Sequence, residues 1–127
     1  MLNTIMQNTM DYISVFSKND RRRYGQFFTN VNTARYMASL TDIPQKDFVK
    51  ILDPGSGNAI LSAALIEKIA KNSSVSKIHL VLYENDKNIL ELLNQSAALI
   101  SEFCKKKNIE ININIYEENF ILLAIAA

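Results

Sequence analysis

The most informative stretch of this chain of 127 residues is Ile51-Leu52-Asp53-Pro54-Gly55-Ser56-Gly57-Asn58-Ala59-Ile60. An apolar run leads into an acidic residue and a Gly-x-Gly turn, and an amphipathic segment follows. This order is typical of a strand, a tight turn and a helix, in which the glycines let the backbone approach a ligand at the carboxyl end of the strand. A second acidic residue, Glu84, ends the next apolar run. The pattern therefore predicts a site for a small nucleoside-bearing ligand where two strands end.

The rest of the sequence alternates between helical and extended patterns. Helices are expected over residues 3–17, 29–40, 58–71 and 86–106. Strands are expected over residues 48–52, 77–83 and 109–116, the first of them apolar enough to be buried on both faces. The charged run 18–23 interrupts the first helical pattern, and 24–28 is expected to be an aromatic loop. Alternating strands and helices predict an α/β fold with a parallel sheet, whose first strand lies on an open edge.

The composition narrows the class of protein. The length fits one compact unit, in which we expect an N-terminal helical region over residues 1–47 and an α/β region over 48–127. The formal net charge of +1 gives no overall attraction to nucleic acid. No apolar stretch approaches the ~20 residues of a membrane span. One Cys and one His argue against a disulfide and against a His/Cys metal site. We therefore expect a cytoplasmic protein without a metal or a membrane anchor.

The residues of the first turn favour a cationic group over a pyrophosphate. A dinucleotide turn reads Gly-x-Gly-x-x-Gly, but the third position here is Ile60. The sequence instead reads Asp-x-Gly-x-Gly from Asp53, so a carboxylate is available to an ammonium group. Glu84 could accept hydrogen bonds from both hydroxyls of a ribose. S-adenosylmethionine carries an ammonium, a sulfonium and a ribose, so the chemistry indicates this cofactor. The alternatives are an ordinary strand–turn–helix corner and, at Glu84, a solvated acid.

Three motifs together resemble a known family. They are Tyr24-Gly25-Gln26-Phe27-Phe28-Thr29, Asp53-Pro54-Gly55-Ser56-Gly57-Asn58 and Tyr83-Glu84. In this order they make residues 20–120 similar to the N-terminal half of adenine-specific (N6) DNA methyltransferases of restriction–modification systems. The resemblance implies a Rossmann-like S-adenosylmethionine-dependent methyltransferase fold, with a partial parallel sheet, flanking helices and preceding N-terminal helices.

The resemblance also implies which residues bind the cofactor. They are Phe28, Thr29, Asp53, Gly55, Gly57, Glu84, Asn119 and Phe120. The first pair would line the methionine end, the acid and glycines of the turn would form the floor, and Glu84 would bind the ribose. The last pair resembles an Asp-Phe pair whose acid binds the adenine amino group and whose aromatic ring packs on the adenine. The chain departs from the family at Asn119, at Asn30, where Pro is usual, and at Ala59, where Gly is common. These departures bear on affinity more than on fold.

The family's catalytic motif, Asn/Asp-Pro-Pro-Tyr/Phe, does not occur in this sequence, because Pro stands only at positions 44 and 54. The resemblance therefore implies no catalytic residue and no methyl transfer by this chain alone. DNA would be bound through a remainder of the parent protein. We expect a truncated domain, with the apolar tail 120–127 as one sign of it. The alternatives are a non-catalytic methyltransferase-like binding module, which could form a homodimer through the open sheet edge, and a fragment that acts on RNA or protein.

Other conspicuous residues are expected to be structural. Arg21–Arg23 and Lys105–Lys107 follow helical patterns, where positive charge complements a helix C-terminus. His79 lies inside a strand pattern, and no Cys, Asp or Ser stands at a spacing that would indicate a catalytic site with it. Cys104 is expected to be a buried thiol on the apolar face of a helix.

Overall fold

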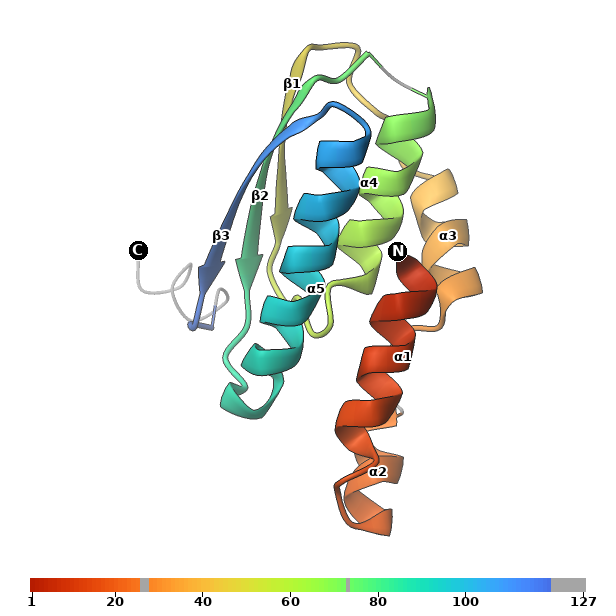
Figure 1. The fold of residues 1–127 in the computed structure, drawn as a ribbon, viewed down its shortest axis with the longest axis vertical. Helices are drawn as coiled ribbons and strands as arrows, with labels where there is room; N and C mark the ends of the chain where they lie inside the picture. The colour runs from red at the N-terminus through yellow and green to blue at the C-terminus, as the bar shows by residue number, and fades with distance from the viewer. Residues whose placement is uncertain (26–27, 73, 120–127) are drawn as a thin grey trace.

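The chain folds into a small parallel sheet with helices packed on one side of it (Figure 1). The computed structural model describes residues 1–25, 28–72 and 74–119. The described helices are α1 (Leu2–Ile13), α2 (Lys18–Gly25), α3 (Val31–Ser39), α4 (Ile60–Asn72) and α5 (Lys87–Lys106). The described strands are β1 (Phe48–Asp53), β2 (Lys77–Tyr83) and β3 (Glu110–Tyr116).

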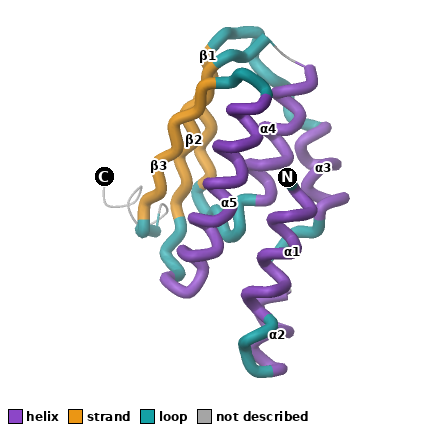
Figure 2. Tube along the Cα trace, viewed as in Figure 1, coloured by secondary structure: helices purple, strands orange, loops and turns teal. Residues whose placement is uncertain are grey.

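The three strands lie in the order β1-β2-β3 and run parallel. Val49 pairs with Ile78, and Ile78 pairs with Ile111. α4 connects β1 to β2 and α5 connects β2 to β3, and both helices lie on the same side of the sheet (Figure 2). The predicted α/β fold with a parallel sheet is confirmed, and among the described strands β1 lies at an edge of the sheet, paired only with β2.

The hydrophobic core lies between the sheet and the helical layer. Ile78, Leu80 and Leu82 of β2 are fully buried and alternate with side chains that face the other way. The helices preceding β1 share this core, because Leu2 and Ile5 of α1 are also fully buried within it. α1 packs on α5 and α4, and α3 packs on α4. Burial of apolar surface between these layers is therefore the main stabilising term of the fold.

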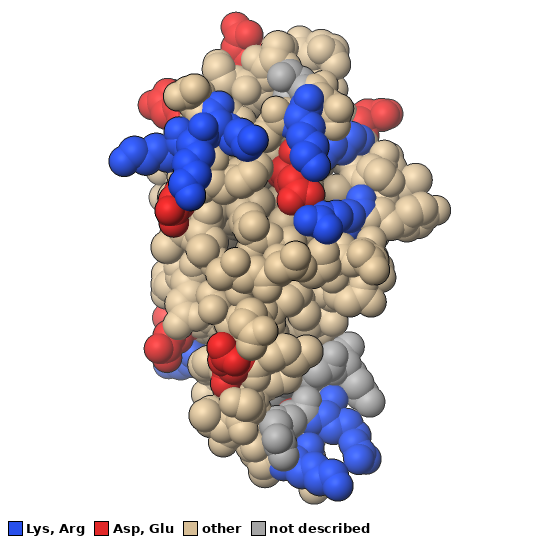
Figure 3. All heavy atoms as spheres, turned by 45° about the vertical axis from the view of Figure 1, so that its right-hand side comes forward, with Lys and Arg blue, Asp and Glu red and all other residues tan. Residues whose placement is uncertain are grey.

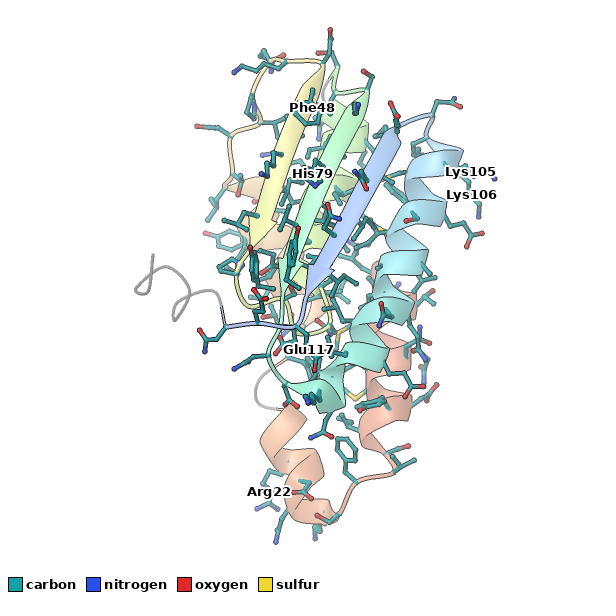
Figure 4. The ribbon with its side chains drawn as sticks, turned by 90° about the vertical axis from the view of Figure 1, so that its left-hand side faces the viewer. Arg22, Phe48, His79, Lys105, Lys106 and Glu117 are labelled. Atoms are coloured by element: carbon teal, nitrogen blue, oxygen red, sulfur yellow. The ribbon has the colours of Figure 1, made fainter. Side chains whose placement is uncertain are left out.

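The opposite face of the sheet carries no helix among the described residues. The prediction that the first strand is buried on both faces is wrong, because Phe48 and Leu52 are 47% and 48% exposed. Figure 4 looks onto this open face, with Phe48 and His79 on neighbouring strands. His79 Nε2 lies 2.6 Å from Asn114 Oδ1 of β3. This hydrogen bond links β2 to β3, which gives His79 the structural role that was expected.

The charged run after α1 is helical rather than a break. Residues 18–23 form most of α2, which also includes Tyr24 and Gly25, where we expected a loop. The reason is local: Ser17 Oγ accepts the N–H of Asp20 at 3.2 Å, and Asp20 lies in the first turn, where a negative charge is favourable. The tail 120–127 lies outside the described residues.

Basic side chains gather where helices end. Lys71 lies in the last turn of α4, and Lys105 and Lys106 lie in the last turn of α5. Figure 3 shows Lys and Arg over that end of the molecule and again at its opposite end, with a largely uncharged band between them. The expectation that Lys105–Lys107 accompany a helix C-terminus is confirmed. No helix among the described residues has the length and apolarity needed to cross a membrane.

Candidate functional site

The Gly-x-Gly turn joins β1 to α4 at the carboxyl ends of the strands. Gly57 has φ +54°, a left-handed conformation that favours glycine. The N–H of Ser56 donates to the carbonyl of Tyr83 at 2.9 Å, so the turn is attached to the end of β2. Gly55 is exposed, and a Cβ atom there would meet nothing within 4 Å. Of the two glycines, only Gly57 is required by the backbone conformation of the turn.

Glu84 binds the turn directly. Its Oε2 atom accepts the N–H of Gly57 at 2.8 Å, and its Oε1 atom accepts the N–H of Asp86 at 3.1 Å. Asp86 in turn caps α5, because its Oδ1 atom accepts the N–H of Asn88 at 2.9 Å. The carboxylate of Glu84 therefore bridges the end of β1 and the start of α5. Glu84 is not a solvated acid at a strand end.

The aromatic-Thr motif approaches the same turn from the N-terminal side. Phe28 Cε1 lies 3.9 Å from the position that a Cβ atom would occupy on Gly57. Phe28 and Thr29 are both half-buried. Asn30 caps α3, since its Oδ1 atom accepts the N–H of Thr33 at 2.8 Å. This cap gives a physical reason for Asn at position 30, because Asn suits a helix start.

Asp53 faces the helical side of the sheet. Its Oδ2 atom accepts the hydroxyl of Ser62 at 2.8 Å. The half-buried carboxylate lines a hollow of about 250 Å³ between β1, α3 and α4, which Met37 and Leu61 also line. The hydrogen bonds of the described residues join Asp53 to α4 and Glu84 to the turn, and none of them joins the two carboxylates. The two acids therefore have different hydrogen-bond partners, on α4 for Asp53 and in the turn for Glu84.

Asn119 follows the end of β3. The carbonyl of Tyr116 accepts the N–H of Glu84 at 3.0 Å, which brings the end of β3 next to the site. Asn119 is half-buried three residues further on. Phe120 lies outside the described residues. Phe28, Gly57 and Glu84 thus meet at one place, while Asp53 and Asn119 lie at its borders.

Asn58 is a member of this region that the sequence reasoning missed. It is 2% exposed, its Nδ2 donates to Thr9 Oγ1 at 3.0 Å, and its Oδ1 accepts the N–H of Ile60 at 3.1 Å. Thr9 belongs to α1 and donates to the carbonyl of Ile5 at 2.7 Å. Asn58 therefore connects α1 to the turn. Asn immediately before a helical pattern was the available signal, because Asn commonly caps helices.

Ala59 has a backbone conformation that favours glycine. Its φ is +63°, and its side chain is fully buried. A left-handed conformation is unfavourable for any residue with a Cβ atom. The sequence singled out Ala59 only by its resemblance to the family, and its left-handed backbone is given by the structure.

Neither a metal centre nor a reactive thiol is found in the described part of the chain. No group of three or more His, Cys, Asp or Glu side chains could hold a metal ion there. Cys104 is fully buried on α5, and its burial raises the pKa of its thiol to about 11. The thiol is therefore protonated at neutral pH, which confirms it as a core residue.

One comparison with known proteins is informative. The chain is 29% identical over 102 residues to the Type II methyltransferase M.BsuBI of Bacillus subtilis, a match that covers 80% of this chain and 19% of that protein. No family model and no solved structure matches the chain. The similarity supports a methyltransferase-like protein, and the parallel sheet with its flanking helices is compatible with a methyltransferase fold. The chain spans about a fifth of the relative's length.

Proposed function

We propose that this chain is the S-adenosylmethionine-binding portion of a DNA adenine N6-methyltransferase. The observation that carries the proposal is the meeting of Phe28, Gly57 and Glu84 where β1 and β2 end. An aromatic ring, a turn with glycine at positions 55 and 57 and a fixed carboxylate are the parts that a nucleoside-bearing cofactor needs. The similarity to a Type II methyltransferase supports the same choice of cofactor.

Glu84 keeps enough acceptor capacity for a ribose. A carboxylate offers about four lone-pair positions. The N–H groups of Gly57 and Asp86 use one position on each oxygen. The remaining positions can accept the two hydroxyls of a ribose without releasing the backbone donors. Because those donors fix the carboxylate before the ligand arrives, little side-chain entropy is lost on binding.

Asp53 can contribute at the methionine end. Ser62 holds Oδ2, and the half-buried carboxylate retains further acceptor positions for an ammonium group. Phe28 supplies an apolar surface beside Gly57. The cofactor would supply an activated methyl group on its sulfonium. The part of this chain is to bind and orient that group, and the sequence contains no Asn/Asp-Pro-Pro-Tyr/Phe motif to hold the adenine.

DNA as the substrate and N6 of adenine as the acceptor rest on the resemblance of three motifs to the adenine-specific family. Asn119 bears on this assignment, because an amide can accept a hydrogen bond from the cofactor's adenine amino group but carries no charge. We assign the reading of DNA and the reaction itself to the parent protein. Restriction–modification is the corresponding biological setting in this proposal.

Calorimetric titration with S-adenosylmethionine tests the proposal. We expect saturable binding to the wild-type chain and a loss of about 1–3 kcal/mol in Glu84→Gln, because one of the two half-buried acceptor oxygens becomes an amide donor. Glu102→Gln is the matched control, since Glu102 lies near the other end of α5 and is exposed. Absence of binding by the folded wild type would remove the cofactor and favour a non-catalytic module. Equal affinities for all three proteins would remove Glu84 from the site.

A further inference from the structure

The polar helix α2 has no part in the proposed cofactor site. Its sequence, Lys-Asn-Asp-Arg-Arg-Arg-Tyr-Gly, contains four basic residues and one acid, a formal charge of +3. The whole chain has a formal net charge of +1, so the remaining residues together carry −2. We expected Arg21–Arg23 to complement the C-terminus of the preceding helix, but the last turn of α1 contains no basic residue. The basic run therefore belongs to α2 and needs another explanation.

The stability of α2 itself does not explain this charge pattern. Lys18 stands at the first position of the helix, where the helix dipole disfavours a positive charge. Arg22 follows four residues later, so the two side chains share one face of the helix, and like charges at this spacing repel each other. Both residues are exposed. This face would therefore be stabilised by an anion.

α2 lies at the end of the molecule toward which the strands point (Figures 1 and 2). The candidate site lies at that end too, since it is built where β1 and β2 end. Figure 4 shows Arg22 there, with its side chain directed away from the body of the molecule. Gly25 ends α2 three residues before Phe28, so their Cα atoms are at most ~11 Å apart. Because Phe28 lies beside Gly57, the basic helix is close to the site.

The surroundings of the site are acidic apart from α2. The described carboxylates at or just beyond the carboxyl ends of the strands are Asp53, Glu84, Asp86, Glu117 and Glu118. Lys87 is the described basic residue among them, and its Nζ atom lies 3.9 Å from Glu117 Oε1. Glu91 of α5 and Asp11 of α1 add further negative charge, and Asp11 accepts a hydrogen bond from Gln7. A polyanion that approaches the site is repelled by these carboxylates, so it requires positive charge at this end, and α2 supplies it.

We propose that α2 binds the phosphate backbone of duplex DNA beside the base that is brought to the cofactor. The choice of DNA rests on the proposed function, and the inference adds a DNA contact made by this chain itself. A base that leaves the duplex to reach an enzyme site keeps its flanking phosphates nearby. Those phosphates would lie along the face that Lys18 and Arg22 share and would relieve the repulsion between them. Such a contact positions the DNA without reading its sequence.

The composition of α2 favours a nucleic acid over an anionic membrane surface. A helix that lies on a membrane needs an apolar face opposite its basic face. α2 contains one aromatic residue, Tyr24, and no Leu, Ile, Val, Met or Phe. Arginine also suits a phosphate group, because its planar guanidinium donates several hydrogen bonds in a fixed geometry.

Fluorescence anisotropy of a labelled DNA duplex of about 20 base pairs, titrated with the full chain at about 50 mM salt, tests the proposal. We expect saturable binding that becomes at least about tenfold weaker in the variant Arg21→Gln/Arg22→Gln/Arg23→Gln. The slope of log K against log salt concentration should also become shallower by about 1–2, because each neutralised phosphate contributes about 0.9. A purely structural role of these residues would leave that slope unchanged.

The matched control removes the same charge from the other end of the molecule. Lys105→Gln/Lys106→Gln/Lys107→Gln should weaken binding less than about threefold, since Figure 4 shows Lys105 and Lys106 at the end opposite Arg22. Replacement of Arg21–Arg23 by Lys keeps the charge and should keep the affinity within about threefold, which separates loss of charge from loss of folding.

Three outcomes would overturn the proposal. They are equal losses in the arginine and lysine variants, no binding of the wild-type chain at low salt, and tighter binding to an RNA duplex or to phosphatidylserine vesicles than to DNA. Calorimetry with S-adenosylmethionine on the same proteins separates this inference from the proposed function. If the wild type bound DNA through α2 but not the cofactor, the proposed cofactor would be wrong and the DNA contact would stand. If it bound the cofactor but not DNA, the inference about α2 would be wrong and the cofactor site would stand.

Discussion

The two faces of the sheet are made from alternate residues of the same three strands, yet they serve different purposes. On the helical face, Leu80 and its neighbours are fully buried, and they hold the layers together. On the open face, His79 and Asn114 form a hydrogen bond at half-buried positions, and Tyr83 stacks on Tyr116 with ring centroids 5.1 Å apart. The difference indicates that most of the buried core lies on the helical face, although Val81 on the open face is also buried.

Substitution of adjacent residues on β2 gives the largest test of this contrast. Leu80→Ala should lower the free energy of unfolding by about 2–5 kcal/mol, because it removes buried apolar contacts and leaves a cavity. His79→Ala, one residue away, should cost about 0.5–1.5 kcal/mol, because it loses one hydrogen bond on the open face. Urea denaturation of both variants measures the two values. Similar losses would mean that the open face is covered in solution.

The covered and open faces were not equally predictable from the sequence. Regular apolar spacing placed β2 at its observed bounds and α5 within one residue of them, because long periodic segments bury a continuous stripe. β1 was harder, since Val49 and Phe48 are equally apolar although only Val49 is buried. Which face a helix covers depends on how the elements pack, and the residues of a short strand do not encode it.

The residues of the candidate site were likewise predictable from the sequence only in part. Gly57 and Glu84 could be chosen from the sequence, because a Gly-x-Gly turn and an acid at the next strand end carry a recognisable chemistry. Their direct hydrogen bond could not be predicted, because the two residues are far apart in the chain. The contact between Asn58 and Thr9 has the same character. Contacts between distant segments require the packed structure, whereas local turns and caps follow from residue type.

Asn58→Ala tests whether a buried polar contact contributes to the free energy of unfolding as the apolar core does. We expect a loss of about 1–3 kcal/mol in the free energy of unfolding, because the buried N–H of Ile60 loses its acceptor and Thr9 loses a donor. Asn94→Ala is the control, since Asn94 is exposed and bonds only within α5 according to its described contact. Thermal or urea denaturation checks both proteins. A loss no larger than that of the control would mean that α1 is not held to the turn through Asn58.

The smallest expected effect comes from two alanines that are equally buried but differ in backbone conformation. Ala59 and Ala63 are both fully buried, but Ala59 has φ +63° whereas Ala63 lies within α4. Ala63→Gly should destabilise the fold by more than about 1 kcal/mol, because it loses a buried methyl group and adds a flexible residue to a helix. Ala59→Gly loses the same methyl group but relieves a left-handed conformation that costs about 1–2 kcal/mol. We therefore expect Ala59→Gly to be close to neutral and about 1–2 kcal/mol more stable than Ala63→Gly in urea denaturation. Equal losses in the two variants would show that packing of the methyl group, rather than the backbone of the turn, governs position 59.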